Sequence, residues 1–205
     1  MGELGGELGG HPDRLRWNAK YAKYAKNAKN AEKQDGAGGS FRAHPVAEAA
    51  LALSPPEGPV LDLACGPSGS ALLAASNGRR VTAVDVSEVA LDLLDREARR
   101  RGVRELLTLV HADLGTWRAE EPFAVVLCTG FWDRAVFEGV VDAVAPGGAL
   151  GWEAFTLDAR AERPRLPARW CLEAGQPASL LPRDFAVVLQ EDVAGGKRRT
   201  LARRT

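Results

Sequence analysis

From residue 60 onward, short apolar runs alternate with segments in which apolar residues recur at helical spacing. The apolar runs are rich in valine and leucine and do not alternate strictly with polar residues, which is typical of strands buried on both faces of a sheet. We predict strands at 60–63, 80–84, 106–110, 123–128 and 149–155.

Three predicted helices lie between these strands, at 70–76, from a Ser87 cap to Gly102, and at 132–144. Asn77-Gly78, Gly102 and Pro146-Gly147-Gly148 are typical stop signals for them. Repeated strand–helix units predict an α/β fold with a doubly wound, mostly parallel sheet and a ligand at the carboxyl edge of its strands.

Gly195-Gly196 lies between two C-terminal segments, a strand-like one at 185–192 and a basic one at 197–204. This arrangement predicts an antiparallel C-terminal hairpin on the otherwise parallel sheet. Its basic strand is expected to face solvent and to resist pairing at the sheet edge, although a phosphate-binding tail is an alternative.

The N-terminal segment differs from the rest of the chain. Residues 1–10 contain Gly-Glu-Leu-Gly-Gly twice and are expected to be a flexible tail, while the Ala-Lys-Xaa repeats at 20–33 predict a helix. A period of three forms no broad apolar face, so this helix is expected to dock through Trp17, Tyr21 and Tyr24. With a hinge at 35–40, we predict a tail and helical arm at 1–40 and the main domain at 41–205, which begins with a helix from Pro45 to Leu53.

Composition narrows the class of protein. The chain has 205 residues, 45% of them hydrophobic, and a formal net charge of zero, which fits one globular domain and gives no general attraction to nucleic acid. No apolar run is long enough for a membrane span, and the start lacks the pattern of a secretory signal. Three widely spaced cysteines suggest neither a disulfide framework nor a metal site, so a cytoplasmic location is expected.

The segment Pro59-Val-Leu-Asp-Leu-Ala-Cys-Gly-Pro-Ser-Gly69 predicts a strand, a loop of small residues and the start of a helix. Asp85 follows the next predicted strand, 19 residues beyond Gly66, where such sheets present an acid to ribose hydroxyls. The loop lacks the three glycines that approach a pyrophosphate. Asp62 just before it favours a cationic group, such as an ammonium or sulfonium, over a diphosphate.

These residues resemble the first motif of class I S-adenosylmethionine-dependent methyltransferases. The resemblance extends to Asp85 as the ribose acid, to Asp113-Leu114 beside adenine, to the fourth strand at 123–128 and to the turn at 145–148 before the fifth. It implies the seven-stranded, Rossmann-like fold of that family. It is closest to small members of the tellurite-resistance type, whose Trp-x-x-x-Tyr pattern is similar to Trp17 and Tyr21.

The resemblance implies S-adenosyl-L-methionine as the cofactor and a set of residues that contact it. These are Trp17, Tyr21, Asp62, Ala64, Cys65, Gly66, Asp85, Val86, Asp113, Leu114 and Cys128. In this arrangement, amides at 64–66 face the cofactor's carboxylate and Asp62 balances its ammonium. Ala64 and Ser68 replace usual glycines. Alanine is tolerable at a negative φ, whereas serine at a positive φ would carry strain.

Methyl transfer from a sulfonium to a small-molecule acceptor requires alignment more than a dedicated catalytic residue, so none is assigned. Side chains expected near the mouth are Thr129, Asp133, Arg134, Glu153 and His44. Each of three has a structural alternative: Asp133 can cap a helix, Glu153 can pair with an arginine, and His44 can simply precede a helix. Phe131 and Trp132 are candidates for an acceptor pocket or for the core, and segment 162–179, with Trp170, is a candidate lid together with residues 17–24.

Two other functions remain open at this point. A dinucleotide-dependent oxidoreductase is the first, and the missing glycine pattern and Asp62 disfavour it. A nucleic-acid-binding or regulatory protein that has lost turnover would use the Ala-Lys repeats and the basic tail, and its RNA binding would depend strongly on salt. The acceptor and the oligomeric state are not specified by the sequence.

Overall fold

The computed structural model describes residues 8–35 and 41–205, with side chains described at 8–26 and 41–205. Most of the predicted tail and all but the first residue of the predicted hinge lie outside these ranges. The helices and strands are α1 (Pro12–Asp35), α2 (Pro45–Ala52), β1 (Val60–Leu63), α3 (Gly69–Ser76), β2 (Val81–Asp85), α4 (Glu88–Arg100), β3 (Leu107–His111), β4 (Phe123–Thr129), α5 (Arg134–Val141), β5 (Val144–Phe155), β6 (Phe185–Val193) and β7 (Lys197–Arg204). Short 3-10 helices η1 (Arg104–Leu106), η2 (Leu157–Ala161), η3 (Ala168–Trp170) and η4 (Ala178–Leu180) lie in the connections.

The seven strands form one sheet in the order β3-β2-β1-β4-β5-β7-β6. The pairs β1–β2, β2–β3, β1–β4 and β4–β5 are parallel, whereas β5–β7 and β6–β7 are antiparallel. The predicted doubly wound sheet with an antiparallel C-terminal hairpin is therefore confirmed. The order reverses at β1 and β4, which places the switch point of the sheet between their carboxyl ends.

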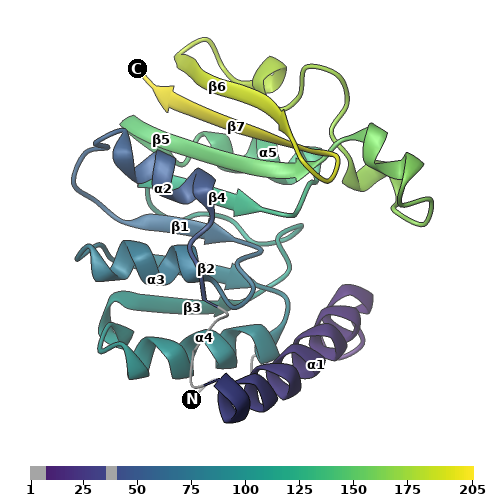
Figure 1. Cartoon of the computed structure of the whole chain (residues 1–205). Coiled ribbons are helices and arrows are strands. Elements are labelled where there is room, and N and C mark those ends of the chain that lie inside the picture. Colours follow the sequence, from purple (N-terminus) through teal and green to yellow (C-terminus); the bar gives the residue numbers. More distant parts are fainter. Residues whose placement is uncertain (1–7, 36–40) are drawn as a thin grey trace.

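Helices cover both faces of the sheet (Figure 1). On one face, Ala50 of α2, Leu72 of α3 and Leu94 of α4 belong to one buried cluster with β1 and β2. On the other face, Phe137 of α5 packs with Trp152 of β5 in a second cluster. Every residue of β1 is buried, which explains why its sequence is a continuous apolar run interrupted only by Asp62.

The prediction was wrong at the boundary between α5 and β5. The helix was expected at 132–144, but α5 ends at Val141 and Val144 already pairs with Phe123. The Pro146-Gly147-Gly148 segment is not a turn before the strand but an irregularity within β5, where the register shifts from Phe123/Val144 to Val125/Ala149. Gly148 is required there, because a Cβ would lie 2.7 Å from the Ala145 carbonyl oxygen and 2.9 Å from that of Ala124.

The basic segment also differs from its prediction. β7 is not a solvated edge strand, because it lies between β5 and β6, and its residues Thr200, Leu201 and Ala202 are buried. The edge strand on this side of the sheet is β6. Arginines of β7 instead pair with acids of the neighbouring strands, such as Arg198 with Asp192 of β6.

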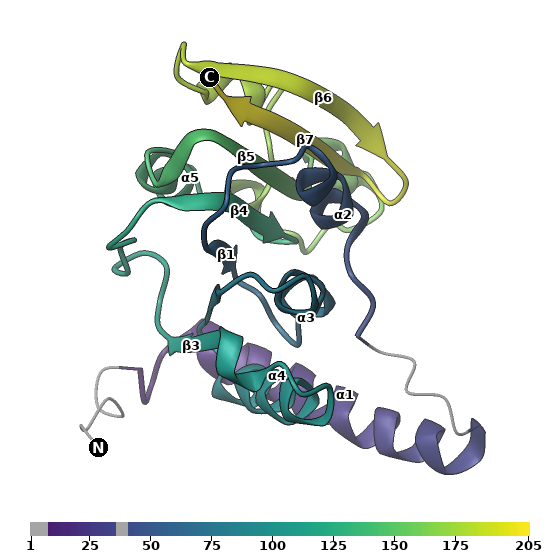
Figure 2. The same cartoon turned by 90° about the vertical axis from the view of Figure 1, so that its left-hand side faces the viewer.

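The N-terminal helix α1 lies beside α4, and its C-terminal part extends past α4 and away from the sheet (Figure 2). Polar contacts help to attach it: Arg14 Nε donates to Oε2 of Glu88 at 2.9 Å, and the Ser87 hydroxyl donates to Oδ1 of Asn18 at 2.6 Å. Docking therefore uses polar residues as well as Tyr21, one of the three predicted aromatic residues, whose hydroxyl lies close to Gly66. None of the helices within 8–35 and 41–205 combines the length and apolar character that a membrane span requires.

Candidate active site

A pocket of about 240 Å³ opens at the carboxyl edge of the sheet. Its wall combines one face of α1, the residues that follow β1 to β5, and the connection after β5. The lining residues are His11, Asp13, Arg16, Trp17, Lys20, Tyr21, Ala64, Asp85, Val86, Ala112, Asp113, Leu114, Thr129, Gly130, Phe131, Trp132, Phe155, Leu166 and Trp170. Segments separated by more than 100 residues in the chain therefore share one cavity.

The loop after β1 is held by its own backbone. The amide of Cys65 donates to the Val84 carbonyl at 3.1 Å, and the amide of Gly66 donates to Oδ2 of Asp85 at 2.8 Å. Two of the three amides that were expected to face a ligand carboxylate are thus bonded within the protein. Gly66 has φ +57, which glycine adopts without strain.

The expected positions of strain in this loop are reversed. Ala64 has φ +46, in the left-handed region that disfavours a side chain, whereas Ser68 has φ −78. Ser68 is the N-cap of α3, and its hydroxyl oxygen accepts from the Ala71 amide at 2.9 Å. Serine therefore replaces a glycine without strain and stabilises the helix that follows the loop.

Asp62 points into the protein and is not part of the pocket wall. It is 2% exposed, and its Oδ2 accepts from the Ser68 hydroxyl at 2.5 Å. Burial raises the pKa of Asp62 to about 7, against the opposite effect of the Ser68 hydrogen bond. Near neutral pH this group is partly protonated, which makes it a weak counter-ion for an ammonium.

Asp85 ends β2 and lines the pocket. Its Oδ2 accepts from Gly66 and its Oδ1 accepts from the Ser87 amide at 2.8 Å, so one carboxylate ties the β1 loop to the start of α4. Burial raises the pKa of Asp85 and outweighs these two hydrogen bonds, which lower it. The remaining acceptor positions of the carboxylate are available to a ligand hydroxyl, since each ionised oxygen accepts more than one hydrogen bond.

Asp113 and Leu114 follow β3 on the same wall. Oδ1 of Asp113 accepts from the Gly115 amide at 3.0 Å, and Oδ2 lies 3.6 Å from Nε2 of His11. The other ring nitrogen of His11, Nδ1, is buried without a hydrogen-bond partner among the described residues. A buried polar atom without a partner in a pocket wall indicates that a ligand supplies one.

Aromatic residues of α1 cover the β1 loop. The rings of Trp17 and Tyr21 stack with centroids 5.8 Å apart. A Cβ on Gly66 would lie 2.7 Å from the Tyr21 hydroxyl oxygen, so only glycine allows the helix to approach this closely. Burial, followed by the nearby charge of Asp85, raises the pKa of Tyr21, which stays neutral.

The other end of the pocket is aromatic. Thr129 ends β4 and Phe131 follows it, Phe155 ends β5, and Trp170 lies in η3. Trp132 reaches the wall but is 3% exposed and packs against Phe137, with ring centroids 5.4 Å apart, so it belongs both to the pocket wall and to the core.

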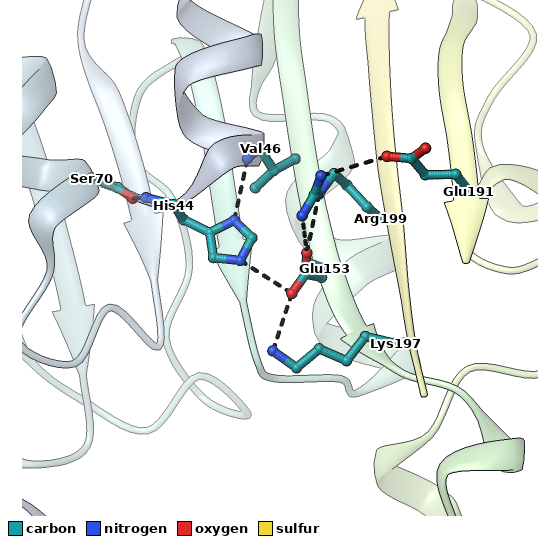
Figure 3. A network of polar contacts seen from close by, with 7 residues as sticks. All are labelled: His44, Val46, Ser70, Glu153, Glu191, Lys197 and Arg199. Carbon is teal, nitrogen blue, oxygen red and sulfur yellow. Dashed lines mark hydrogen bonds and ion pairs between the residues drawn. The ribbon is translucent and has the colours of Figure 1, made fainter. Parts of the chain in front are cut away.

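Glu153 of β5 does not line the pocket. It lies in the centre of an ion-pair network (Figure 3). Its carboxylate is 3.1 Å from Nε2 of His44, 3.1 Å from Nζ of Lys197 and 3.0 Å from Nη2 of Arg199. Burial alone would raise the pKa of Glu153, but hydrogen bonds from His44 and Lys197 lower it to about 2. A carboxylate of such low basicity is unsuited to accept a proton from an acceptor.

Both ring nitrogens of His44 also form hydrogen bonds within the protein. Its Nδ1 accepts from the Val46 amide at 3.2 Å at the start of α2, so Nε2 carries the proton that it donates to Glu153. Asp133 caps α5 by accepting from Val136, and Arg134 pairs with Glu138. Of the five mouth candidates, Thr129 alone lines the pocket.

Seven of the predicted cofactor residues line the pocket, namely Trp17, Tyr21, Ala64, Asp85, Val86, Asp113 and Leu114. Asp62, Cys65, Gly66 and Cys128 do not. Cys128 is buried, with Sγ 3.7 Å from the Phe131 carbonyl oxygen, and all three cysteines are free thiols. Sequence reasoning missed His11, which precedes α1. It also missed Arg16 and Lys20, whose only signal is their place on the same helix as Trp17 and Tyr21.

Comparisons with known proteins agree with this arrangement. Residues 60–148 match a family described as methyltransferase domain, while no curated protein sequence matches the chain. TehB from Haemophilus influenzae is similar in structure, with a TM-score of 0.65 and 18% identity over 85% of this chain and 65% of that one. TehB is a tellurite-resistance methyltransferase, the type that the sequence resembles.

Two further solved structures share the fold. The glycopeptide N-methyltransferase MtfA complexed with sinefungin has a TM-score of 0.58 and 20% identity over 82% of this chain and 95% of that one. Coclaurine N-methyltransferase bound to N-methylheliamine and SAH has a TM-score of 0.60 and 15% identity over 78% of this chain and 71% of that one. The matching family is not one of dinucleotide-dependent oxidoreductases, and the nucleic-acid-binding alternative gains no support. Residues 60–148 are therefore similar to a methyltransferase domain, and the chain has the Rossmann-like fold of these solved methyltransferases.

Proposed function

We propose that the pocket under α1 holds S-adenosyl-L-methionine and that the protein methylates a small molecule. The observation that carries this assignment is that Asp85 and Asp113, at the ends of adjacent strands, line one pocket with the Ala64 loop. In the proposed complex Asp85 accepts from ribose hydroxyls, Asp113 accepts from the adenine amine, and Val86 and Leu114 contact the rings.

The residues present fit this ligand. The unpartnered Nδ1 of His11 lies beside the proposed adenine end, and the Gly66 position admits Tyr21 over the loop. Asp62, Cys65, Gly66 and Cys128 lie outside the wall, so we assign them a role in shaping the loop rather than in direct contact. Asp62 and Ser68 hold the start of α3, and Gly66 presents its amide to Asp85.

When bound, the cofactor would supply an electrophilic methyl group, activated by the positive charge of its sulfonium. The protein's part is alignment and exclusion of water. Trp17 and Tyr21 close the pocket from α1, and Leu166 and Trp170 close it from the connection after β5. This enclosure supports a small acceptor over a macromolecular one.

A cytoplasmic location belongs to the same proposal, because three free thiols suit a reducing compartment.

Isothermal titration with S-adenosylhomocysteine and with NAD tests the site. We expect selective binding of the former, and a loss of about tenfold or more in Asp113→Asn, which removes a charged acceptor. Asp92→Asn on exposed α4 surface is the matched control and leaves binding unchanged. Equal affinity for NAD, or an unchanged dissociation constant in both Asp113→Asn and Asp85→Asn, would refute the assignment.

A further inference from the structure

Two cationic side chains of α1 line the pocket without a carboxylate partner. The guanidinium carbon of Arg16 lies 4.7 Å from the Trp170 ring centroid and 5.6 Å from that of Trp17. Nζ of Lys20 lies 4.2 Å from the Trp17 centroid. Neither cation forms an ion pair with any side chain described at 8–26 or 41–205, whereas Arg14 on the same helix pairs with Glu88.

This arrangement concentrates positive charge in the pocket wall. Arg16 and Lys20 are four residues apart and therefore lie on one face of the helix, where like charges repel. Burial lowers the pKa of Lys20, and the charges of Arg16 and Lys197 lower it further, although Asp85 opposes them. An anion between Arg16 and Lys20 would offset this repulsion.

The pocket therefore has two chemically different ends. The end formed by β2 and β3 presents the acids Asp85 and Asp113, which suit hydroxyl and amine donors. The other end presents aromatic rings from β4, β5 and η3, and Arg16 contacts the Trp170 ring of that end directly. Arg16 is thus linked to the part of the wall that the proposed adenosine end leaves open, whereas Lys20 lies over the Trp17 and Tyr21 rings, between the two ends.

We propose that the methyl acceptor is an organic anion with a flat apolar body. Its carboxylate, or an equivalent anionic group, contacts Arg16 and Lys20, and its body packs against Phe131, Phe155 and Trp170. Guanidinium groups bind carboxylates and stack on aromatic rings at the same time, which is the situation of Arg16. This inference rests on the proposed function, because it assigns the cofactor to the acidic end.

The test measures binding rather than turnover. Wild-type protein saturated with S-adenosylhomocysteine is titrated with benzoate, indole-3-carboxylate and 4-aminobenzoate, and with the neutral amide of each. We expect at least one carboxylate to bind about tenfold or more tightly than its amide, the range of a charge-assisted contact. Arg16→Gln and Lys20→Gln should each reduce that ratio, with less than a twofold change in affinity for S-adenosylhomocysteine.

Lys23→Gln is the matched control, because Lys23 is exposed on the same helix and does not line the pocket. It changes net charge equally and should keep the carboxylate preference. Equal binding of acid and amide throughout the series overturns the inference. An equal loss of S-adenosylhomocysteine affinity in Arg16→Gln overturns it as well, because the cations would then hold the cofactor's own carboxylate. Failure of S-adenosylhomocysteine to bind the wild type would instead refute the proposed function.

Discussion

The hydroxyl of Ser68 donates to the buried carboxylate of Asp62 at 2.5 Å and, at the same time, accepts from the amide of Ala71. One small side chain thus connects the carboxylate of β1 to the first turn of α3. The position where the resemblance expected a glycine has become a structural link that holds the loop between strand and helix.

Ser68→Ala should therefore cost more than the loss of an ordinary helix cap. It removes the cap and leaves a buried carboxyl group without its donor, for an expected loss of about 3 kcal/mol in the free energy of unfolding. Urea denaturation measures this value. Asp133→Ala, which removes only the cap of α5, is the control and should cost about 1 kcal/mol. Equal losses in the two variants would show that the Asp62 contact contributes nothing.

Asp62 should make the protein less stable as pH rises. Burial raises its pKa to about 7, so the folded state keeps a proton that the unfolded state releases near its ordinary value of 3.8. The contribution to stability is complete below the unfolded pKa and is lost as pH rises toward 7. Asp62→Asn removes this dependence.

We therefore expect the stability of Asp62→Asn relative to wild type to increase by on the order of 2 kcal/mol between pH 5 and pH 8. Urea denaturation of both proteins at each pH gives this double difference, in which groups shared by the two proteins cancel. Asp92→Asn, at an exposed position, should show no such change. A constant difference across this range would mean that Asp62 stays ionised.

The sheet was predictable because its central strands are buried on both faces. Burial makes β1 and β4 continuous apolar runs, and their predicted bounds lie within one residue of the structure. The shorter α5 and the irregular start of β5 were not predictable, because Val144 pairs with Phe123, far away in the chain, and this pairing outweighs a local Pro-Gly-Gly stop signal.

The site was predictable only in part, because some of its residues are placed by contacts between segments far apart in the chain. Asp85 ends β2 and Asp113 follows β3, and these two strands are neighbours in the sheet. The place of each acid relative to its strand in the sequence is therefore sufficient to predict that both lie at the carboxyl edge. Arg16 and Lys20 enter the pocket because Arg14 and Asn18 attach α1 to α4. That docking depends on contacts about 70 residues apart in the chain, and the Ala-Lys pattern around them gives no indication of which face turns inward.

Ala64→Gly should stabilise the protein. Ala64 has φ +46, and a left-handed conformation costs a non-glycine residue roughly 1–2 kcal/mol, more than the roughly 0.4–1 kcal/mol that glycine adds to the entropy of the unfolded chain. The expected net gain is about 0.5–1 kcal/mol in urea denaturation. Ser54 has φ 53 outside the pocket, and Ser54→Gly is the matched control with the same expected gain. Destabilisation by Ala64→Gly alone would show that the Ala64 methyl group contributes packing that exceeds the strain.

Glu153→Gln should show what the buried ion-pair network contributes. Three cationic or proton-donating groups converge on this carboxylate, and its removal leaves Lys197 and Arg199 without their main anionic partner. Breaking a buried charge pair from one side costs about 3–5 kcal/mol, and the partial exposure of the partners places the expected loss near the lower limit. Glu191→Gln removes only the exposed partner of Arg199 and should cost less than about 1 kcal/mol.

The pH dependence provides a second measurement of the same network. Burial raises the pKa of Glu153, but the hydrogen bonds from His44 and Lys197 lower it from its ordinary 4.5 to about 2. The stability it contributes is therefore present above pH 4.5 and is lost as pH falls through 2. In urea denaturation, the difference between wild type and Glu153→Gln should shrink from pH 6 to pH 3. A difference that is small and independent of pH would show that desolvation of the carboxylate cancels its three contacts.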